Sequence, residues 1–231
     1  MNTFDSYFIK KLQSFPLLIL ILTVLTGCGT SLTREELYPK IYVEKPVSIL
    51  IMPPINQTNH VDAKEYFYSS LMMPLAEKGY YIFSPYLSEE LLQQESANDA
   101  EQFIDTSLKP FLNVFNTDAV LFTIIKKWDK SSILSTINVE AEYILKSAHT
   151  NEVLFQRNAD IVVDCSVTQN AGLLGMVANA LATAATDKIV GARKTNSFIV
   201  SDMPEGKYSP MYGVDKKQST KPQNISGTTV R

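Results

Sequence analysis

Cysteine and histidine are both scarce in this 231-residue chain, which has two of each. Cys28 lies in a processing signal, so Cys165 is the only cysteine left as a free thiol and no intramolecular disulfide is expected. His60 and His149 fall in expected turns, without the several closely spaced ligands that a zinc site requires. We therefore predict a domain that is held together by packing and carries no metal and no cofactor.

Long hydrophobic runs and excess basic charge are also missing. The main apolar run, Phe15 to Leu25, is shorter than the ~20 residues of a membrane-spanning helix. The formal net charge is −3, whereas nucleic-acid binding depends on Lys and Arg side chains that neutralise phosphates. The composition therefore argues against a spanning helix and against a nucleic-acid partner.

The N-terminal region has the layout of a bacterial lipoprotein signal peptide. Two lysines precede the apolar run, and Leu25, Thr26, Gly27 and Cys28 follow the spacing of a lipobox. We expect cleavage after Gly27, removal of residues 1–27 and attachment of lipid, palmitate included, to Cys28. Acyl chains of this kind anchor a protein to a membrane without a spanning segment.

The mature chain is expected to divide into three parts. Residues 28–45 form a lipidated tether, residues 46–200 a periplasmic α/β domain, and residues 201–231 an irregular segment whose polar tail, 215–231, is disordered. Gly29 stands where an Asp would favour retention in the inner membrane of a Gram-negative cell. We therefore expect the lipid to lie in the outer membrane, with the domain in the periplasm.

The pattern of apolar residues predicts one mixed β-sheet packed with helices. Compact apolar runs at 46–54, 80–83 and 119–125 indicate buried strands, the last of them apolar on both faces. A helix over 62–78, with a break at Pro74, is expected between the first two strands. Strand, helix and strand in this order indicate a βαβ unit with parallel strands.

Two alternating stretches predict an antiparallel hairpin with one apolar and one polar face. They are Thr136–Leu145 and Leu154–Asp164, and Cys165 continues the alternation toward the core. Strands of about ten alternating residues also fit a transmembrane hairpin. We favour a half-buried sheet, because the helices need an apolar sheet face to pack on.

A charge-free stretch over residues 171–185 carries small residues at steps of three and four, among them Gly172, Gly175 and Ala178. This spacing predicts a helix whose small face lets another backbone approach closely. The stretch is too short and too rich in Ala to span a membrane. A core helix or a dimer-interface helix is the favoured interpretation.

Several stretches together resemble one family of bacterial lipoproteins. They are Leu50–Pro54, Pro74–Pro85, Thr117–Phe122 and Pro204–Gly213. The resemblance covers about residues 28–214, and the family, of unknown function, includes a conserved surface-antigen candidate. It implies a fold similar to the N-terminal domain of TolB and related to the periplasmic part of CsgG-type secretion lipoproteins, a CsgG-like lipoprotein as partner, and a homodimer. It implies no catalytic residues.

The sequence contains no recognisable catalytic set. Pairs of carboxylates such as Glu89–Glu90 and Glu140/Glu142 are expected on the surface, and Gly172–Gly175 lacks the Lys-Ser/Thr of a phosphate loop. We predict a non-catalytic accessory subunit of a cell-envelope assembly, such as a CsgG-like secretion or cell-wall-associated complex. Two alternatives stay open: a periplasmic hydrolase with an unrecognised site, and a subunit of an oligomeric β-hairpin pore.

Overall fold

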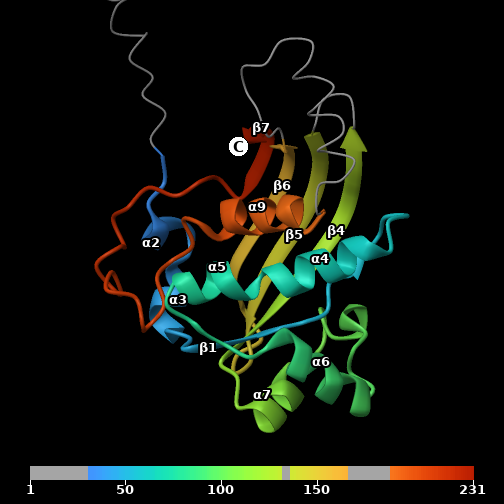
Figure 1. Cartoon of the computed structure of the whole chain (residues 1–231). Helices are drawn as coiled ribbons and strands as arrows, with labels where there is room; N and C mark the ends of the chain where they lie inside the picture. The colour runs from blue at the N-terminus through green and yellow to red at the C-terminus, as the bar shows by residue number, and fades with distance from the viewer. Residues whose placement is uncertain (1–30, 132–135, 166–187) are drawn as a thin grey trace, which may run out of the picture. The chain divides into compact units, whose positions relative to one another are not determined.

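A mixed sheet is the framework of the folded domain (Figure 1), seen in a computed structural model that describes residues 31–131, 136–165 and 188–231. The strand order is β3-β1-β4-β5-β6-β7, with β2 paired to β4. β1 runs parallel to β3 and β4, β4 to β6 are antiparallel, and β7 is parallel to β6. The strands are β1 Ser48–Ile51, β2 Ile55–Asn56, β3 Tyr81–Ile82, β4 Ala119–Ser131, β5 Thr136–Ser147, β6 Val153–Asp164 and β7 Asn224–Val230.

Helices pack against this sheet, which confirms the predicted α/β class. The described helices are α2 Arg34–Leu37, α3 Pro39–Glu44, α4 Asp62–Ser70, α5 Met72–Glu77, α6 Pro85–Gln94, the 3₁₀ turn η1 Ala100–Gln102, α7 Lys109–Phe115 and α9 Lys188–Val200. None of the helices in these described ranges is long and apolar enough to cross a membrane.

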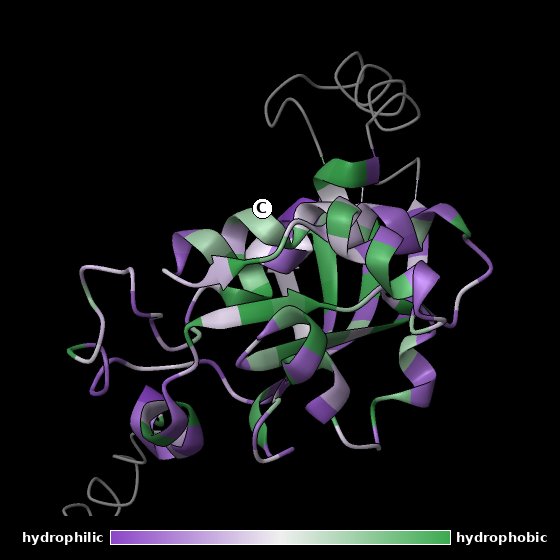
Figure 2. Cartoon of the chain, turned by 90° about the horizontal axis from the view of Figure 1, so that it is seen from below, coloured by the Kyte–Doolittle hydropathy of each residue, from purple (hydrophilic) through white to green (hydrophobic). Residues whose placement is uncertain are grey.

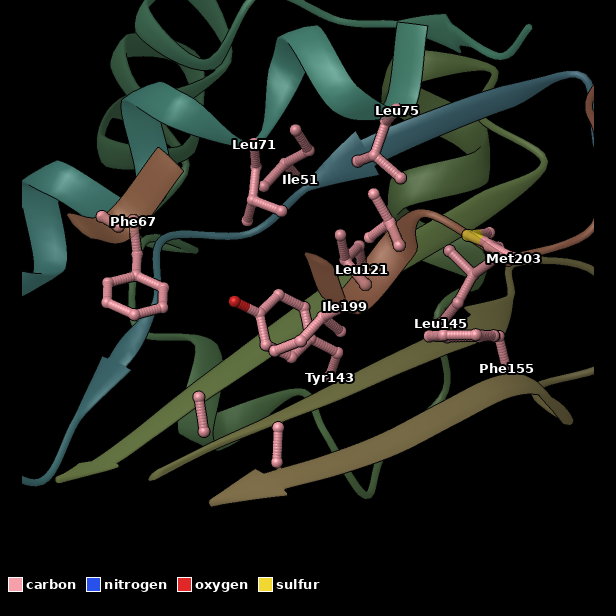
Figure 3. Close-up of a cluster of buried hydrophobic side chains, with 14 of the residues drawn as sticks. Ile51, Phe67, Leu71, Leu75, Leu121, Tyr143, Leu145, Phe155, Ile199 and Met203 are labelled. Carbon is pink, nitrogen blue, oxygen red and sulfur yellow. The ribbon is translucent and has the colours of Figure 1, made fainter. Parts of the chain in front are cut away.

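β1 and the first half of β4 are buried on both faces, as their sequences predict. Ile51 and Leu121 face a cluster formed with α4, α5 and α9, whereas Leu50 and Phe122 face a second cluster formed with α6 and α7. Figure 3 shows the first cluster, with Leu75 above the sheet. In Figure 2 the hydrophobic residues concentrate in the strands, and the connecting loops are mostly hydrophilic. The core therefore has two parts, one on each side of these strands.

The β5–β6 hairpin has the predicted alternation. Val139, Tyr143 and Leu145 are buried in the cluster under α9, while Glu140 and Glu142 lie half-buried on the opposite face. Its apolar face is therefore occupied by the domain's own helices. Cys165, at the end of β6, is buried as expected.

A buried polar side chain, Asn196, joins the helices to the sheet. The Tyr143 hydroxyl donates to Asn196 Oδ1 at 2.5 Å, and Asn196 Nδ2 donates to Phe67 O at 3.0 Å and Ser70 Oγ at 2.8 Å. Burial of polar groups without partners is costly, so this network fixes how α9 and α4 lie on β5. Figure 3 shows the Tyr143 ring under α9.

The predicted helix over 62–78 is two helices. α4 ends at Ser70 and α5 begins at Met72, so the helix is interrupted at Leu71, three residues before Pro74. Proline has no N–H to donate to the carbonyl four residues earlier, which here belongs to Ser70, and its ring crowds that carbonyl. The break was predicted, and its place follows from this missing hydrogen bond.

The expected tether over residues 28–45 is wrong beyond its first residues. The folded unit starts at Leu32. Arg34 in α2, Ile41 in α3 and Tyr38 between the two helices are all buried. Thr33 and Glu36 form a capping box, with Glu36 N donating to Thr33 Oγ1 at 3.3 Å. A Ser/Thr followed by Glu three residues later is a sequence signal for a helix start.

The expected disorder of residues 215–231 is also wrong. β7 pairs with β6 from Asn158↔Asn224 to Val163↔Val230, and Ile225 is buried. A short strand of this kind takes its hydrogen bonds from a partner some 65 residues away in sequence, so its local composition resembles that of a disordered tail. The predicted lipobox and the small-residue positions Gly172, Gly175 and Ala178 lie outside the described residues.

Candidate functional site

Two of the stretches that carry the family resemblance, Pro74–Pro85 and Pro204–Gly213, meet in space, although 118 residues lie between them in the sequence. Gly206 N donates to Lys78 O at 2.7 Å, Tyr208 N donates to Gly79 O at 2.9 Å, and the Tyr80 hydroxyl donates to Pro204 O at 2.8 Å. We call residues 78–80 with 204–209 the motif junction. All three hydrogen bonds are accepted by backbone carbonyls, so the contact fixes the backbone paths of the two segments relative to each other.

Glycine is required at two positions of the motif junction. Gly79 has φ +83°, and a Cβ there would lie 2.3 Å from Ser209 N. A Cβ on Gly206 would lie 2.4 Å from Gly79 O. Both distances are too short for any side chain, so the two backbones touch only because each segment offers a glycine.

Beside the motif junction lies a group of five polar side chains, which we call the ion cluster. Arg34 Nη1 lies 2.9 Å from Asp215 Oδ2 and 3.2 Å from Glu205 Oε1, and Lys78 Nζ lies 2.6 Å from the same Glu205 oxygen. The Tyr42 hydroxyl donates to Asp215 Oδ2 at 3.0 Å. The cluster ties α2, α3 and α5 to the C-terminal segment.

The electrostatics of the ion cluster favour a structural role. Two cations balance two carboxylates, and these four charged side chains are almost wholly buried. Burial strengthens each attraction and makes an unpaired charge costly. Burial, with the charge of Asp215, raises the pKa of Tyr42, and burial raises the pKa of Tyr80. Both phenols therefore stay protonated and act as hydrogen-bond donors, not as bases.

A cavity of about 370 Å³ lies next to the ion cluster. Its lining includes Tyr42, Lys45, Tyr80, Tyr212 and Lys216. Lys216 Nζ lies 5.3 Å from the centre of the Tyr42 ring and 2.6 Å from Glu35 Oε1. Aromatic rings and ammonium groups can bind a ligand, but this lining offers no nucleophile paired with a base.

A second buried ion pair joins β6 to the C-terminal segment. Arg157 has no exposed side-chain surface and pairs with Asp202, and it also donates to Tyr38 Oη at 2.9 Å and Ile199 O at 2.6 Å. Burial alone would raise the pKa of Asp202, but the bond and charge of Arg157 and the Lys221 N–H outweigh it and hold the pKa well below its usual range. Asp202 is therefore ionised at neutral pH.

Neither histidine forms a hydrolytic triad with the side chains that the structure describes. His60 is exposed in the turn before α4, whereas His149 Nε2 lies 3.2 Å from Asp118 Oδ1. Asp118 Oδ2 accepts from Ser48 Oγ at 3.1 Å, so the carboxylate lies between serine and histidine. A hydrolytic triad needs the histidine in that middle position. In the described ranges, no group of three or more His, Cys, Asp or Glu could hold a metal ion.

Glu140 and Glu142 lie on the polar face of the hairpin, as predicted. Lys126 Nζ is 2.8 Å from Glu142 Oε2, and Gln156 Nε2 donates to Glu142 Oε1 at 2.8 Å. These bonds, against the opposing effect of burial, lower the pKa of Glu142. A general acid needs a raised pKa, so Glu142 is poorly suited to be the general acid of a glycosidase.

Cys165 is expected to react very slowly with a thiol reagent in the folded protein. Burial raises the pKa of its thiol, and only the thiolate is nucleophilic. Absorbance with a chromogenic aromatic disulfide should show slow labelling of the full lipidated chain in mild detergent and complete labelling in urea. Rapid labelling without urea would contradict the buried position, and Cys165→Ser provides the blank.

Sequence reasoning missed Arg34, Asp215, Arg157 and Asp202. No local pattern marks them, because each acquires its partner only through the fold. Glu205 offered a weak signal, as a charged residue inside the Pro204–Gly213 stretch that carries the resemblance.

Comparison with known proteins places the chain among lipoproteins. The family model described as "Putative lipoprotein GNA1162-like" matches residues 38–207. "Putative lipoprotein NMB1124/NMB1162" of Neisseria meningitidis serogroup B is 28% identical over 180 residues, which is 75% of this chain and 83% of that protein.

Solved structures are similar as well. The crystal structure of lipoprotein GNA1162 from Neisseria meningitidis is 29% identical, with a TM-score of 0.47 over 61% of this chain and 98% of that one. The LpoB C-terminal domain from Salmonella enterica is 16% identical, with a TM-score of 0.36 over 55% and 93% of the two chains. The expected likeness to TolB and CsgG-type lipoproteins is not among these findings and stays a prediction. The family model matches well over half of the residues of this chain, so the chain belongs to the GNA1162-like lipoprotein family.

Proposed function

We propose that this chain is a non-catalytic accessory subunit of a cell-envelope assembly, anchored by lipid on Cys28 in the outer membrane. Its partner would be another envelope protein, with a CsgG-like lipoprotein as the first candidate. Membership of a lipoprotein family supports the anchor. The chemistry of the described residues supports a binding role, because the buried pairs Arg34–Asp215 and Arg157–Asp202 are committed to structural contacts within the domain.

The observation that carries this proposal is an apolar surface on α6 and α7, which we call the α6–α7 face. Tyr86 is 80% exposed, and Leu87, Leu91 and Val114 are also exposed. A groove of about 170 Å³ is lined by residues of both helices, among them Phe111 of α7. Exposed apolar patches on soluble domains usually mark interaction sites.

Charge indicates what kind of partner fits the α6–α7 face. Residues 85–110 contain one basic side chain, Lys109, and six acidic ones, which are Glu89, Glu90, Glu95, Asp99, Glu101 and Asp105. A complementary partner would present apolar side chains surrounded by Lys and Arg. Charge complementarity of this kind speeds association and selects partners.

Crosslinking in native envelopes tests the proposal. The full lipidated chain, captured after brief crosslinking, should bring down one defined envelope protein, and Cys28→Ala should lose it because the lipid raises the local concentration near a tethered partner. Leu87→Glu with Leu91→Glu should also lose it. Val43→Glu is the matched control, since Val43 is 78% exposed on α3. Recovery of self-crosslinked chain alone, or equal recovery with the Leu87/Leu91 variant, would contradict this role.

A further inference from the structure

The first folded residues of the chain are fixed to its C-terminal segment. Arg34 N donates to Gln218 O at 2.9 Å, Thr220 N donates to Leu32 O at 3.0 Å, and Thr33 forms a β-bridge with Ser219. Residues 32–34 are therefore held in place by backbone hydrogen bonds to the residues on both sides of Ser219. The stretch just before Gln218 lies next to the point where the folded domain begins.

Very little chain separates this point from the lipid. Cys28 stands four residues before Leu32, and four extended residues reach at most ~14 Å. This step rests on the lipid attachment in the proposed function. A domain on so short a connection stays close to the membrane surface, so one of its faces can contact that surface.

The surface beside Leu32 has the composition of a membrane interface. Residues 207–217, which we call the tyrosine loop, end one residue before Gln218 and contain four exposed large apolar or aromatic side chains. They are Tyr208, Met211, Tyr212 and Val214. Tyrosine is enriched at the level of lipid headgroups, where its ring is apolar and its hydroxyl stays hydrated.

The charge of the tyrosine loop fits the same partner. Lys207 and Lys217 are exposed, and neither is in an ion pair within the described ranges. The only acidic residue of the loop, Asp215, is buried in the ion cluster. Lysine side chains near a bilayer are attracted to anionic headgroups. By contrast, the acidic α6–α7 face would be repelled.

We propose that the tyrosine loop is a membrane-contact face, which lays the domain on the leaflet that holds the Cys28 lipid. The tyrosine rings and Met211 lie at headgroup level, and Lys207 and Lys217 contact lipid phosphates. In Figure 1 the loop runs along the side of α2 and α3, whereas α6 and α7 lie at the lower edge of the domain. Membrane contact through the loop therefore leaves the α6–α7 face free for a protein partner.

Quenching by brominated lipids tests this orientation. The full lipidated chain would be reconstituted into vesicles of phosphatidylcholine and phosphatidylglycerol, with or without bromine on the acyl chains. Tyr208→Trp and Tyr212→Trp should each lose emission by at least about twofold in the brominated vesicles, because their indoles lie at the interface. The native Trp128 is 2% exposed in the core and supplies the background, measured with the unmodified chain.

Tyr86→Trp on α6 is the matched control, and its emission should change no more than that of the unmodified chain. Lys207→Glu with Lys217→Glu, added to Tyr208→Trp, should weaken the quenching in anionic vesicles. Flotation of the vesicles reports the anchor separately. If the protein floats but Tyr208→Trp and Tyr212→Trp are not quenched, the membrane-contact face is wrong and the lipid anchor stands.

Three other outcomes would also overturn the inference. Equal quenching of Tyr86→Trp would mean that the domain has no preferred orientation on the membrane. Failure of the protein to float would remove both the anchor and the contact face that depends on it. Protection of Tyr208→Trp from aqueous iodide by a protein partner, without bromolipid quenching, would assign the loop to that partner instead.

Discussion

Gly206→Ala is expected to lower the free energy of unfolding by about 3 kcal/mol, at the upper end of the usual cost of overpacking. The added methyl group would lie 2.4 Å from Gly79 O, 2.6 Å from Gly79 C and 2.9 Å from Tyr80 Cδ1. The two nearest atoms belong to the backbone, so rotation of a side chain cannot make room for the methyl group. The motif junction would have to separate, with loss of the Gly206–Lys78 and Tyr208–Gly79 hydrogen bonds.

Unfolding in urea, followed by Trp128 fluorescence in mild detergent, measures this loss, because Trp128 is buried against Phe67. Gly213→Ala is the matched control. Gly213 has φ +75°, but a Cβ added there would have no atom within 4 Å, so only backbone strain of about 1 kcal/mol is expected. Gly79→Ala combines strain with a clash and should cost the most. If Gly206→Ala costs no more than Gly213→Ala, the close backbone contact is not essential.

Arg157→Met is expected to lower the free energy of unfolding by about 3–5 kcal/mol, the range for breaking a buried ion pair. The substitution removes the hydrogen bonds to five residues at once, which are Asp202, Tyr38, Ile199, Thr220 and Lys221. Asp202 would keep the Lys221 N–H and Lys221 Nζ but would lose its main partner. Its buried charge would then destabilise the fold.

The double variant Arg157→Met with Asp202→Leu should recover part of the loss, since an apolar pair leaves no charge uncompensated. Lys188→Met is the matched control, because its ion pair with Asp62 at 3.2 Å is largely exposed, and a loss of at most about 0.5 kcal/mol is expected. Equal urea midpoints for Arg157→Met and Lys188→Met would show that the Arg157 network contributes no special stability.

Acid should weaken the same network. The pKa of Asp202 is held below its usual value of 3.8 in the folded state. A lowered carboxyl pKa contributes stability that is fully present above the unfolded value and is lost as pH falls through the folded one. The urea concentration at the midpoint of unfolding should therefore decrease as the pH is lowered below about 4. Asp202→Asn should be less stable at neutral pH and should show a shallower fall in acid.

Residues close in sequence determined much of the fold. Alternation along Thr136–Leu145 and Leu154–Asp164 predicted the hairpin and the buried position of Cys165. The run over 119–125 predicted a strand with two buried faces, and Pro74 predicted a helix break. These features depend on periodicity and local backbone chemistry, which a single segment displays on its own.

Other features came from contacts between distant segments. β7 forms because β6 offers it a ladder of hydrogen bonds, and α2 is part of the domain because Gln218 and Asp215 bind it. The composition of both segments resembled that of a tether or a tail. A loop-like composition indicates that a segment does not fold alone. It carries no information on whether another segment of the chain will pair with it.

By itself, then, the sequence predicted the lipoprotein signal, and it determined the α/β class and the family. Only the tertiary structure decided that the stretches around Gly79 and Gly206 touch, that Arg34 and Asp215 share a buried ion cluster, and that the tyrosine loop lies beside the first folded residue. The physical reason is that hydrophobic periodicity repeats within one segment. Ion pairs and glycine contacts need two segments, and their sequence separation leaves no periodic trace.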